Sequence, residues 1–93
     1  MLSAKEKRAL RSEGNKLKAE IWIGKEGISE GTLQAVENSF NTKALVKIKL
    51  QESCPLQKKA AADILARKCR AELVQIIGSA MLLFRELPDE ENG

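Results

Sequence analysis

The residues best suited to chemistry in this chain are two glycines that flank a lysine and a glutamate. The segment 24–27, GKEG, follows a short apolar run and precedes Ser29, a residue type that begins helices. Glycines at this spacing let the backbone approach a ligand closely, and free amides at a helix start favour an anion. Lys25 would add a positive charge at the tip. The segment therefore predicts an anion-binding loop or, on the plainer interpretation, only a tight turn.

A second group of candidates lies in the N-terminal segment. Residues 3–13 open with the S-x-x-E pattern of a capping box, which predicts a helix. On that helix Arg8 and Arg11 share a face, and Lys5 lies one turn before Arg8. Such a face is suited to contact phosphates, although a basic helix face can also be merely solvated.

The charge of the chain is unevenly distributed. Sixteen Lys and Arg against 13 Asp and Glu give a net charge of +3 over 93 residues. All sixteen bases lie within residues 1–85, where nine acids leave +7, whereas the last eight residues, ELPDEENG, carry four acids and no base. The basic segment 1–85 would attract polyanions such as nucleic-acid phosphates. The alternative is that the excess of lysine only keeps the protein soluble.

Several kinds of chemistry are disfavoured by composition. The chain has no His and two Cys, so it lacks the commonest general base and metal ligand and cannot form a four-thiolate zinc site. We therefore expect no catalysis, no metal and no cofactor. No apolar run approaches the roughly 20 residues of a membrane span, and the N-terminus is too charged for a signal peptide. These features predict a cytoplasmic protein without membrane contact, in which Cys54 and Cys69 are reduced.

Hydrophobic patterning predicts the elements that position these residues. Helices are expected over 3–13, 29–41 and 56–70, and strands over 19–23, 44–50, 72–77 and 81–85. Gly14 is expected to end the first helix in a left-handed conformation. The apolar side of the third helix is expected to comprise Ala60, Ala61, Ile64 and Leu65.

The order of these elements is α-β-α-β-α-β-β. Strands separated by helices run parallel, and the closing hairpin adds an antiparallel strand, so we expect a compact α/β sandwich with a mixed four-stranded sheet. Residues 1–85 would form one domain, and 86–93 an acidic flexible tail.

Four segments taken together resemble the bacterial YhbY family: LSAKEKRALR at 2–11, IWIGKEGISEGTL at 21–33, ALVKIKL at 44–50 and AELVQIIGSAMLLFR at 71–85. That family consists of a single CRM domain, the chloroplast RNA splicing and ribosome maturation domain. The resemblance covers nearly all of residues 2–85. It implies an RNA-binding module whose fold is similar to the C-terminal domain of translation initiation factor three.

The resemblance also implies a function and a site. Members of the family are associated with precursors of the large ribosomal subunit and assist its assembly. Their RNA-binding surface combines the G-x-x-G loop with basic residues of the first helix. Carried over by position, that surface would comprise Gly24, Lys25, Glu26, Gly27, Lys5, Arg8 and Arg11. The side chain of Glu26 does not favour a phosphate, so this residue would contribute its backbone amide or only spacing.

Other residues are candidates on their chemistry alone. Trp22 could stack on an unpaired base or pack against a helix, and Lys18 could contact phosphate or be solvated. Lys47 and Lys49 could extend the basic surface over the sheet, or could only keep an uncovered face of the sheet solvated. The two Phe, Phe40 and Phe84, are expected in the core.

These observations favour a monomeric, non-catalytic protein that binds ribosomal RNA within large-subunit precursors. Because aromatic residues make up only 3% of the chain, we expect RNA backbone and shape to dominate recognition. The alternative is a protein-interaction adaptor whose basic face docks an acidic partner. An enzyme is the weakest alternative.

Overall fold

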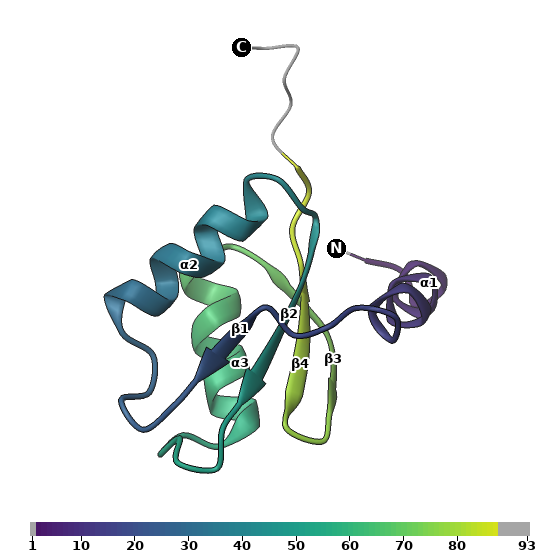
Figure 1. The fold of residues 1–93 in the computed structure, drawn as a ribbon. Coiled ribbons are helices and arrows are strands. Elements are labelled where there is room, and N and C mark those ends of the chain that lie inside the picture. The colour runs from purple at the N-terminus through teal and green to yellow at the C-terminus, as the bar shows by residue number, and fades with distance from the viewer. Residues whose placement is uncertain (1, 88–93) are drawn as a thin grey trace.

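The computed structural model describes residues 2–87, so most of the predicted tail, 86–93, lies outside the described residues. Three helices and four strands follow one another in the predicted order (Figure 1). They are α1 (Ala4–Gly14), β1 (Ile21–Ile23), α2 (Glu30–Phe40), β2 (Leu45–Leu50), α3 (Lys58–Lys68), β3 (Glu72–Ile77) and β4 (Ala80–Phe84). The α/β class and the four-stranded sheet are confirmed, although β1 is shorter than the predicted strand over 19–23.

The sheet is mixed, with strand order β1-β2-β4-β3. β1 pairs with β2 in parallel, and β4 lies antiparallel between β2 and β3. The three strands separated by helices therefore all run in one direction, as predicted. A tight connection at Gly78, where φ is +57°, returns the chain from β3 into β4. β4 thus occupies the interior position that a simple succession of crossovers would give to β3.

One face of the sheet carries the main core, beneath α2 and α3. Phe40 and Val36 from α2, and Leu65 from α3, are fully buried there. The strands contribute alternate residues to the same layer, because successive side chains of a strand point to opposite faces. They include Ile21, Ile23, Val46, Ile48, Met81 and Leu83. Ala61 and Leu65 are buried as predicted, whereas Ile64 is half-buried. The prediction for Ala60 is wrong, because this side chain is exposed.

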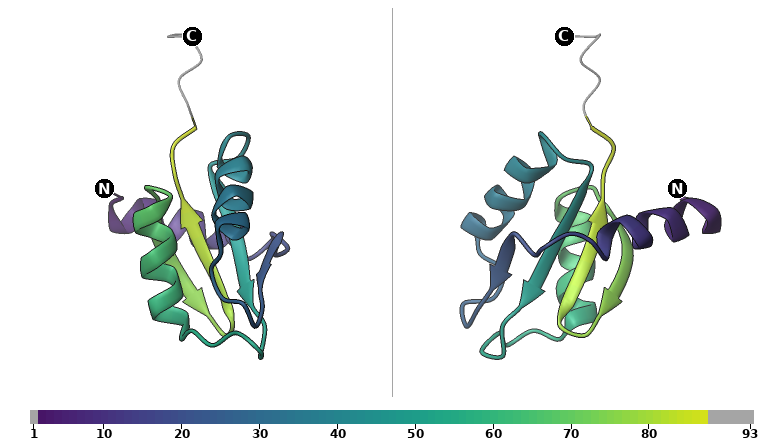
Figure 2. Two further views of the ribbon diagram at one scale, coloured as in Figure 1. Left: turned by 90° about the vertical axis from the view of Figure 1, so that its left-hand side faces the viewer. Right: turned by 45° about the vertical axis from the view of Figure 1, so that its right-hand side comes forward.

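The opposite face is covered in part by α1, as the two views of Figure 2 show. A small second cluster forms there around Leu45, Val74 and Leu82, with Leu10 of α1 packed against it. Phe84 joins this cluster half-buried, so it supports α1 rather than the main core.

Gly14 fixes how closely α1 approaches the sheet. The predicted capping box at the start of the helix is confirmed, with Ser3 and Glu6 exchanging hydrogen bonds. The prediction that Gly14 ends the helix in a left-handed conformation is wrong, because Gly14 is the buried last residue of α1 and its φ is not positive. Glycine is required there for space, since a Cβ would overlap the Cδ2 atom of Leu82.

We expect Gly14→Ala to lower the free energy of unfolding by about 1 kcal/mol, because overpacking against Leu82 outweighs the helix propensity that alanine gains. Urea denaturation monitored by circular dichroism measures the change. The control is Gly31→Ala in α2, where the new Cβ would lie 3.6 Å from the Ser29 hydroxyl, an ordinary contact, and stability should not fall. In a Leu82→Ala background the cost at Gly14 should disappear; an undiminished cost would contradict the close-approach explanation.

Candidate nucleic-acid interface

The GKEG segment forms a hydrogen-bonded turn directly after the edge strand β1. The amide of Gly27 donates to the carbonyl of Gly24 at 3.0 Å, and Gly27 has φ +69°, a left-handed conformation that favours glycine. At Gly24 a Cβ would lie 2.7 Å from the Oε1 atom of Gln51, but this atom ends a flexible, exposed side chain that can move aside, so space alone does not require glycine there. The turn itself therefore explains Gly27 but not Gly24, while Lys25 and Glu26 are exposed at its tip.

The start of α2 is less available to an anion than the sequence indicated. Ser29 accepts a hydrogen bond from the amide of Thr32 at 3.2 Å, and the two residues form a capping box. Glu30 adds a negative charge in the first turn. A phosphate at this loop would therefore meet the ammonium of Lys25 and the amides of the turn, rather than the helix terminus.

The basic face of α1 is exposed to solvent. Lys5 and Arg8 are exposed and Arg11 is half-buried, and none of the three has an ion-pair partner among residues 2–87. Their neighbour Lys7 instead lies 3.9 Å from the carboxylate of Glu72 in β3. At the beginning of the helix, the hydrogen bond from the backbone amide of Ser3 holds the pKa of Glu6 below its usual value. Glu6 is therefore ionised at neutral pH and completes the cap of α1.

The structure places the predicted site residues in two separate groups. α1, with its basic face, lies to one side of the sheet, whereas the GKEG turn follows the edge strand on the other side (Figures 1 and 2). Lys18, in the connection between α1 and β1, is exposed. Trp22 is 55% exposed, so the alternative in which it packs against a helix is wrong. An RNA that met both groups would have to cross the uncovered part of the sheet.

The two lysines of β2 have different surroundings. The Nζ atom of Lys47 donates to the carbonyl of Leu17 at 3.1 Å and to that of Gly14 at 3.4 Å. A cation at the C-terminal end of a helix satisfies carbonyls that have no partner inside the helix and opposes the negative end of its dipole. Lys47 therefore fastens the end of α1 to the sheet, whereas Lys49 is exposed.

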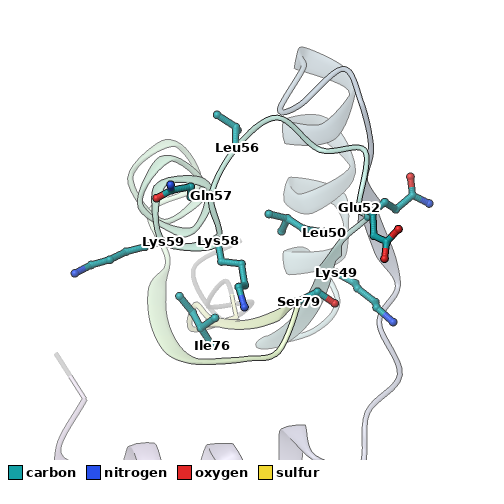
Figure 3. Close-up of a pocket in the computed structure, with 10 residues that line it drawn as sticks. Lys49, Leu50, Glu52, Leu56, Gln57, Lys58, Lys59, Ile76 and Ser79 are labelled. Carbon is teal, nitrogen blue, oxygen red and sulfur yellow. The ribbon is translucent and has the colours of Figure 1, made fainter.

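A hollow of about 830 Å³ was not anticipated from the sequence. It lies between the end of β2, the start of α3 and the β3–β4 hairpin (Figure 3). In Figure 3 Lys58 reaches into this hollow, whereas Lys59 points away from it. The first turn of α3 contains these two lysines, no acid and no side-chain cap. Basic residues in a first turn interact unfavourably with the positive end of the helix dipole. In the sequence, the two lysines at the start of this helix were the feature that could have drawn attention to the hollow.

No group of three His, Cys, Asp or Glu residues that could hold a metal is found within residues 2–87. The same described range contains no helix that is both long and apolar enough to cross a membrane. Cys54 and Cys69 are free cysteines, and burial raises the pKa of the Cys69 thiol, which keeps it protonated.

Comparison with known proteins identifies the family. Residues 2–85 match the CRS1 / YhbY (CRM) domain, and the chain belongs to this family. The resemblance seen in the sequence is thereby confirmed.

Relatives come from bacteria, archaea and a plant. The chain is 30% identical to the "Probable RNA-binding protein YqeI" of Bacillus subtilis over 92% of its own length and 90% of the relative. It is 36% identical to the "Probable RNA-binding protein MJ0652" of Methanocaldococcus jannaschii, over 90% of this chain and 63% of that protein. The solution structure of SAV1595 from Staphylococcus aureus, described as a candidate RNA-binding protein, is similar with a TM-score of 0.82 at 33% identity, covering 99% and 96% of the two chains.

The role assigned to Lys47 can be tested by comparing it with its neighbour on the same strand. We expect Lys47→Ala to lower the free energy of unfolding by about 1–2 kcal/mol, because the carbonyl of Gly14 at the end of α1 and that of Leu17 in the connection after it lose a charged donor. Amide hydrogen exchange of α1, measured by NMR, should accelerate selectively. Lys49→Ala is the control and should change stability by less than about 0.5 kcal/mol. Equal effects of the two substitutions would contradict the anchoring role.

Proposed function

We propose that this protein binds RNA through the outer face of α1 and the GKEG turn. The observation that carries the proposal is that exposed cations without ion-pair partners lie in α1 and at the GKEG turn, two of the segments that carry the family resemblance. Among the described residues, ion pairs are formed by three bases, Lys7, Lys43 and Arg85. Lys5, Arg8 and Lys25 are exposed and unpaired, so RNA phosphates can replace their counterions without breaking an internal contact. Membership of a family whose relatives carry the names reported above supports the same partner.

The geometry favours recognition of RNA backbone and shape. The turn presents a single ammonium, from Lys25, and the amides of Lys25 and Glu26, which donate to no acceptor within residues 2–87. The α1 face adds Lys5, Arg8 and the half-buried Arg11 on the other side of the sheet. Cations held apart on a rigid sheet select an RNA whose phosphates have the matching separation. Phosphate contacts of this kind position the RNA and read little sequence.

The finer proposal is that the RNA is ribosomal and belongs to precursors of the large subunit. Its support is the sequence resemblance to the YhbY family. The protein would act as a monomer in the cytoplasm, and would hold an RNA conformation during assembly without catalysing a reaction. The adaptor alternative predicts instead that the same cations dock an acidic protein.

Charge reversal tests the proposed surface. Arg8→Glu combined with Lys25→Glu should weaken binding to a labelled ribosomal RNA fragment at least tenfold, and should reduce the slope of log K against log salt by about 2, because two phosphate contacts are lost. Fluorescence anisotropy over a salt series measures both quantities. The matched control, Arg67→Glu with Lys68→Glu, reverses two exposed charges at the end of α3 and should leave the affinity near that of the unmodified protein. Equal losses of RNA affinity in both variants would mean that net charge, and not the proposed surface, determines binding.

Crosslinking in living cells tests the ribosomal proposal separately. Ultraviolet crosslinking followed by sequencing of the attached RNA should enrich large-subunit ribosomal RNA and its precursors over messenger and transfer RNA. The Arg8→Glu, Lys25→Glu variant, expressed at the same level, supplies the background. Reads distributed in proportion to RNA abundance would count against the ribosomal assignment. If a partner protein is still recovered with this chain after nuclease treatment, and no RNA is crosslinked, the adaptor alternative is favoured.

A further inference from the structure

The sheet carries an exposed row of residues that neither the core nor α1 covers. Trp22 pairs in register with Lys49, Lys49 with Ala80, and Ala80 with Ile77, so one residue from each strand lies side by side across the sheet. At the usual spacing of strands the row spans about 14 Å. Trp22 is 55% exposed and Ile77 57%. We call these four residues the open row.

The open row lines a shallow hollow of about 510 Å³ beside the end of α1. Leu17 and Lys18 form its rim on the side of the α1–β1 connection, and Leu17 is also exposed, at 39%. None of the residues that line the hollow is acidic. The hollow therefore combines a flat aromatic ring, aliphatic side chains and exposed ammonium groups.

Trp22 connects this hollow with the proposed RNA site, because it also lines the smaller depression at the GKEG turn, together with Lys25 and Ser29. A strand of RNA whose backbone lies at Lys25 can therefore continue onto the sheet without leaving the protein. The small side chain of Ala80, between Lys49 and Ile77, leaves room for a planar group above the sheet.

We propose that the open row binds one or two unpaired nucleotides adjoining the RNA segment held at the GKEG turn. A base has the flat apolar face that Trp22 can stack on, and its phosphates have the charge that Lys18 and Lys49 oppose. A base inside a duplex is already stacked on both faces, so this site selects unpaired nucleotides. The proposal rests on the RNA-binding function above and adds to it a preference for junctions between duplex and single strand.

The single tryptophan reports directly on this site. The chain contains one Trp and no Tyr, so its emission comes from Trp22. We would titrate the full chain with three labelled RNAs: a blunt duplex, the same duplex with a short adenosine extension, and the same extension with abasic residues. The adenosine extension should bind about five- to a hundredfold more tightly than the abasic extension and quench Trp22 emission, whereas the abasic extension should gain over the blunt duplex only what its phosphates add and should leave the emission unchanged.

Variants separate this inference from the proposed function. Trp22→Ala should bring the ratio of the affinities for the adenosine and abasic extensions close to one, and Trp22→Phe should retain part of the preference for adenosine. Lys25→Glu should weaken binding of all three RNAs while keeping the ratios of their affinities. Failure of every RNA to bind would overturn the proposed function together with this site. Equal binding of the three RNAs with unchanged emission would overturn the claim that the open row binds nucleotides, without affecting the proposed function. It would point to a protein as the occupant of the open row.

Discussion

The close approach of α1 to β4 determines what this protein can present to a partner. Gly14 allows the helix to lie against Leu82, and Lys47 fastens the end of the helix through two carbonyls. Because the helix is held at that point, it covers one part of the sheet and leaves the part next to β1 open. The basic face of α1 and the open row take their positions from this one contact, whereas the GKEG turn is positioned by the pairing of β1 with β2.

The opposite face supplies the rigidity that such a surface needs. Phe40 and Leu65 are fully buried beneath α2 and α3. Arg85, just after β4, donates to the carboxylate of Glu37 at 2.9 Å and to the carbonyl of Cys69 at 2.8 Å, and its guanidinium lies 4.9 Å from the centre of the Phe40 ring. This contact joins the end of the sheet to both helices. Exposed cations on a rigid platform keep fixed separations, which is what recognition of RNA shape requires.

Local features of the fold could be predicted from the sequence, whereas contacts between distant segments could not. The capping box at Ser3 depends on residues three positions apart, and the alternation in β2 depends on one strand, so both were predictable. Glycine is needed at position 14 because the side chain of Leu82, far along the chain, lies against it. No local sequence pattern indicates this contact. Similarly, the G-x-x-G spacing indicated a loop but not its separation from α1. The alignment of Trp22 with Ile77 depends on strand order and register, which hydrophobic pattern alone leaves open.

Mapping of backbone amide shifts tests the central claim, that one face of the protein receives RNA from α1 across the sheet to the turn. The isotopically labelled protein would be titrated with an RNA duplex bearing a single-stranded extension and followed by two-dimensional NMR. We expect shifts to concentrate at the outer face of α1, at Lys18, Trp22 and Lys49, and at the tip of the turn, while amides of α2 and α3 beyond the first turns change little. Shifts concentrated on α2 and α3, with α1 and the turn unchanged, would contradict it.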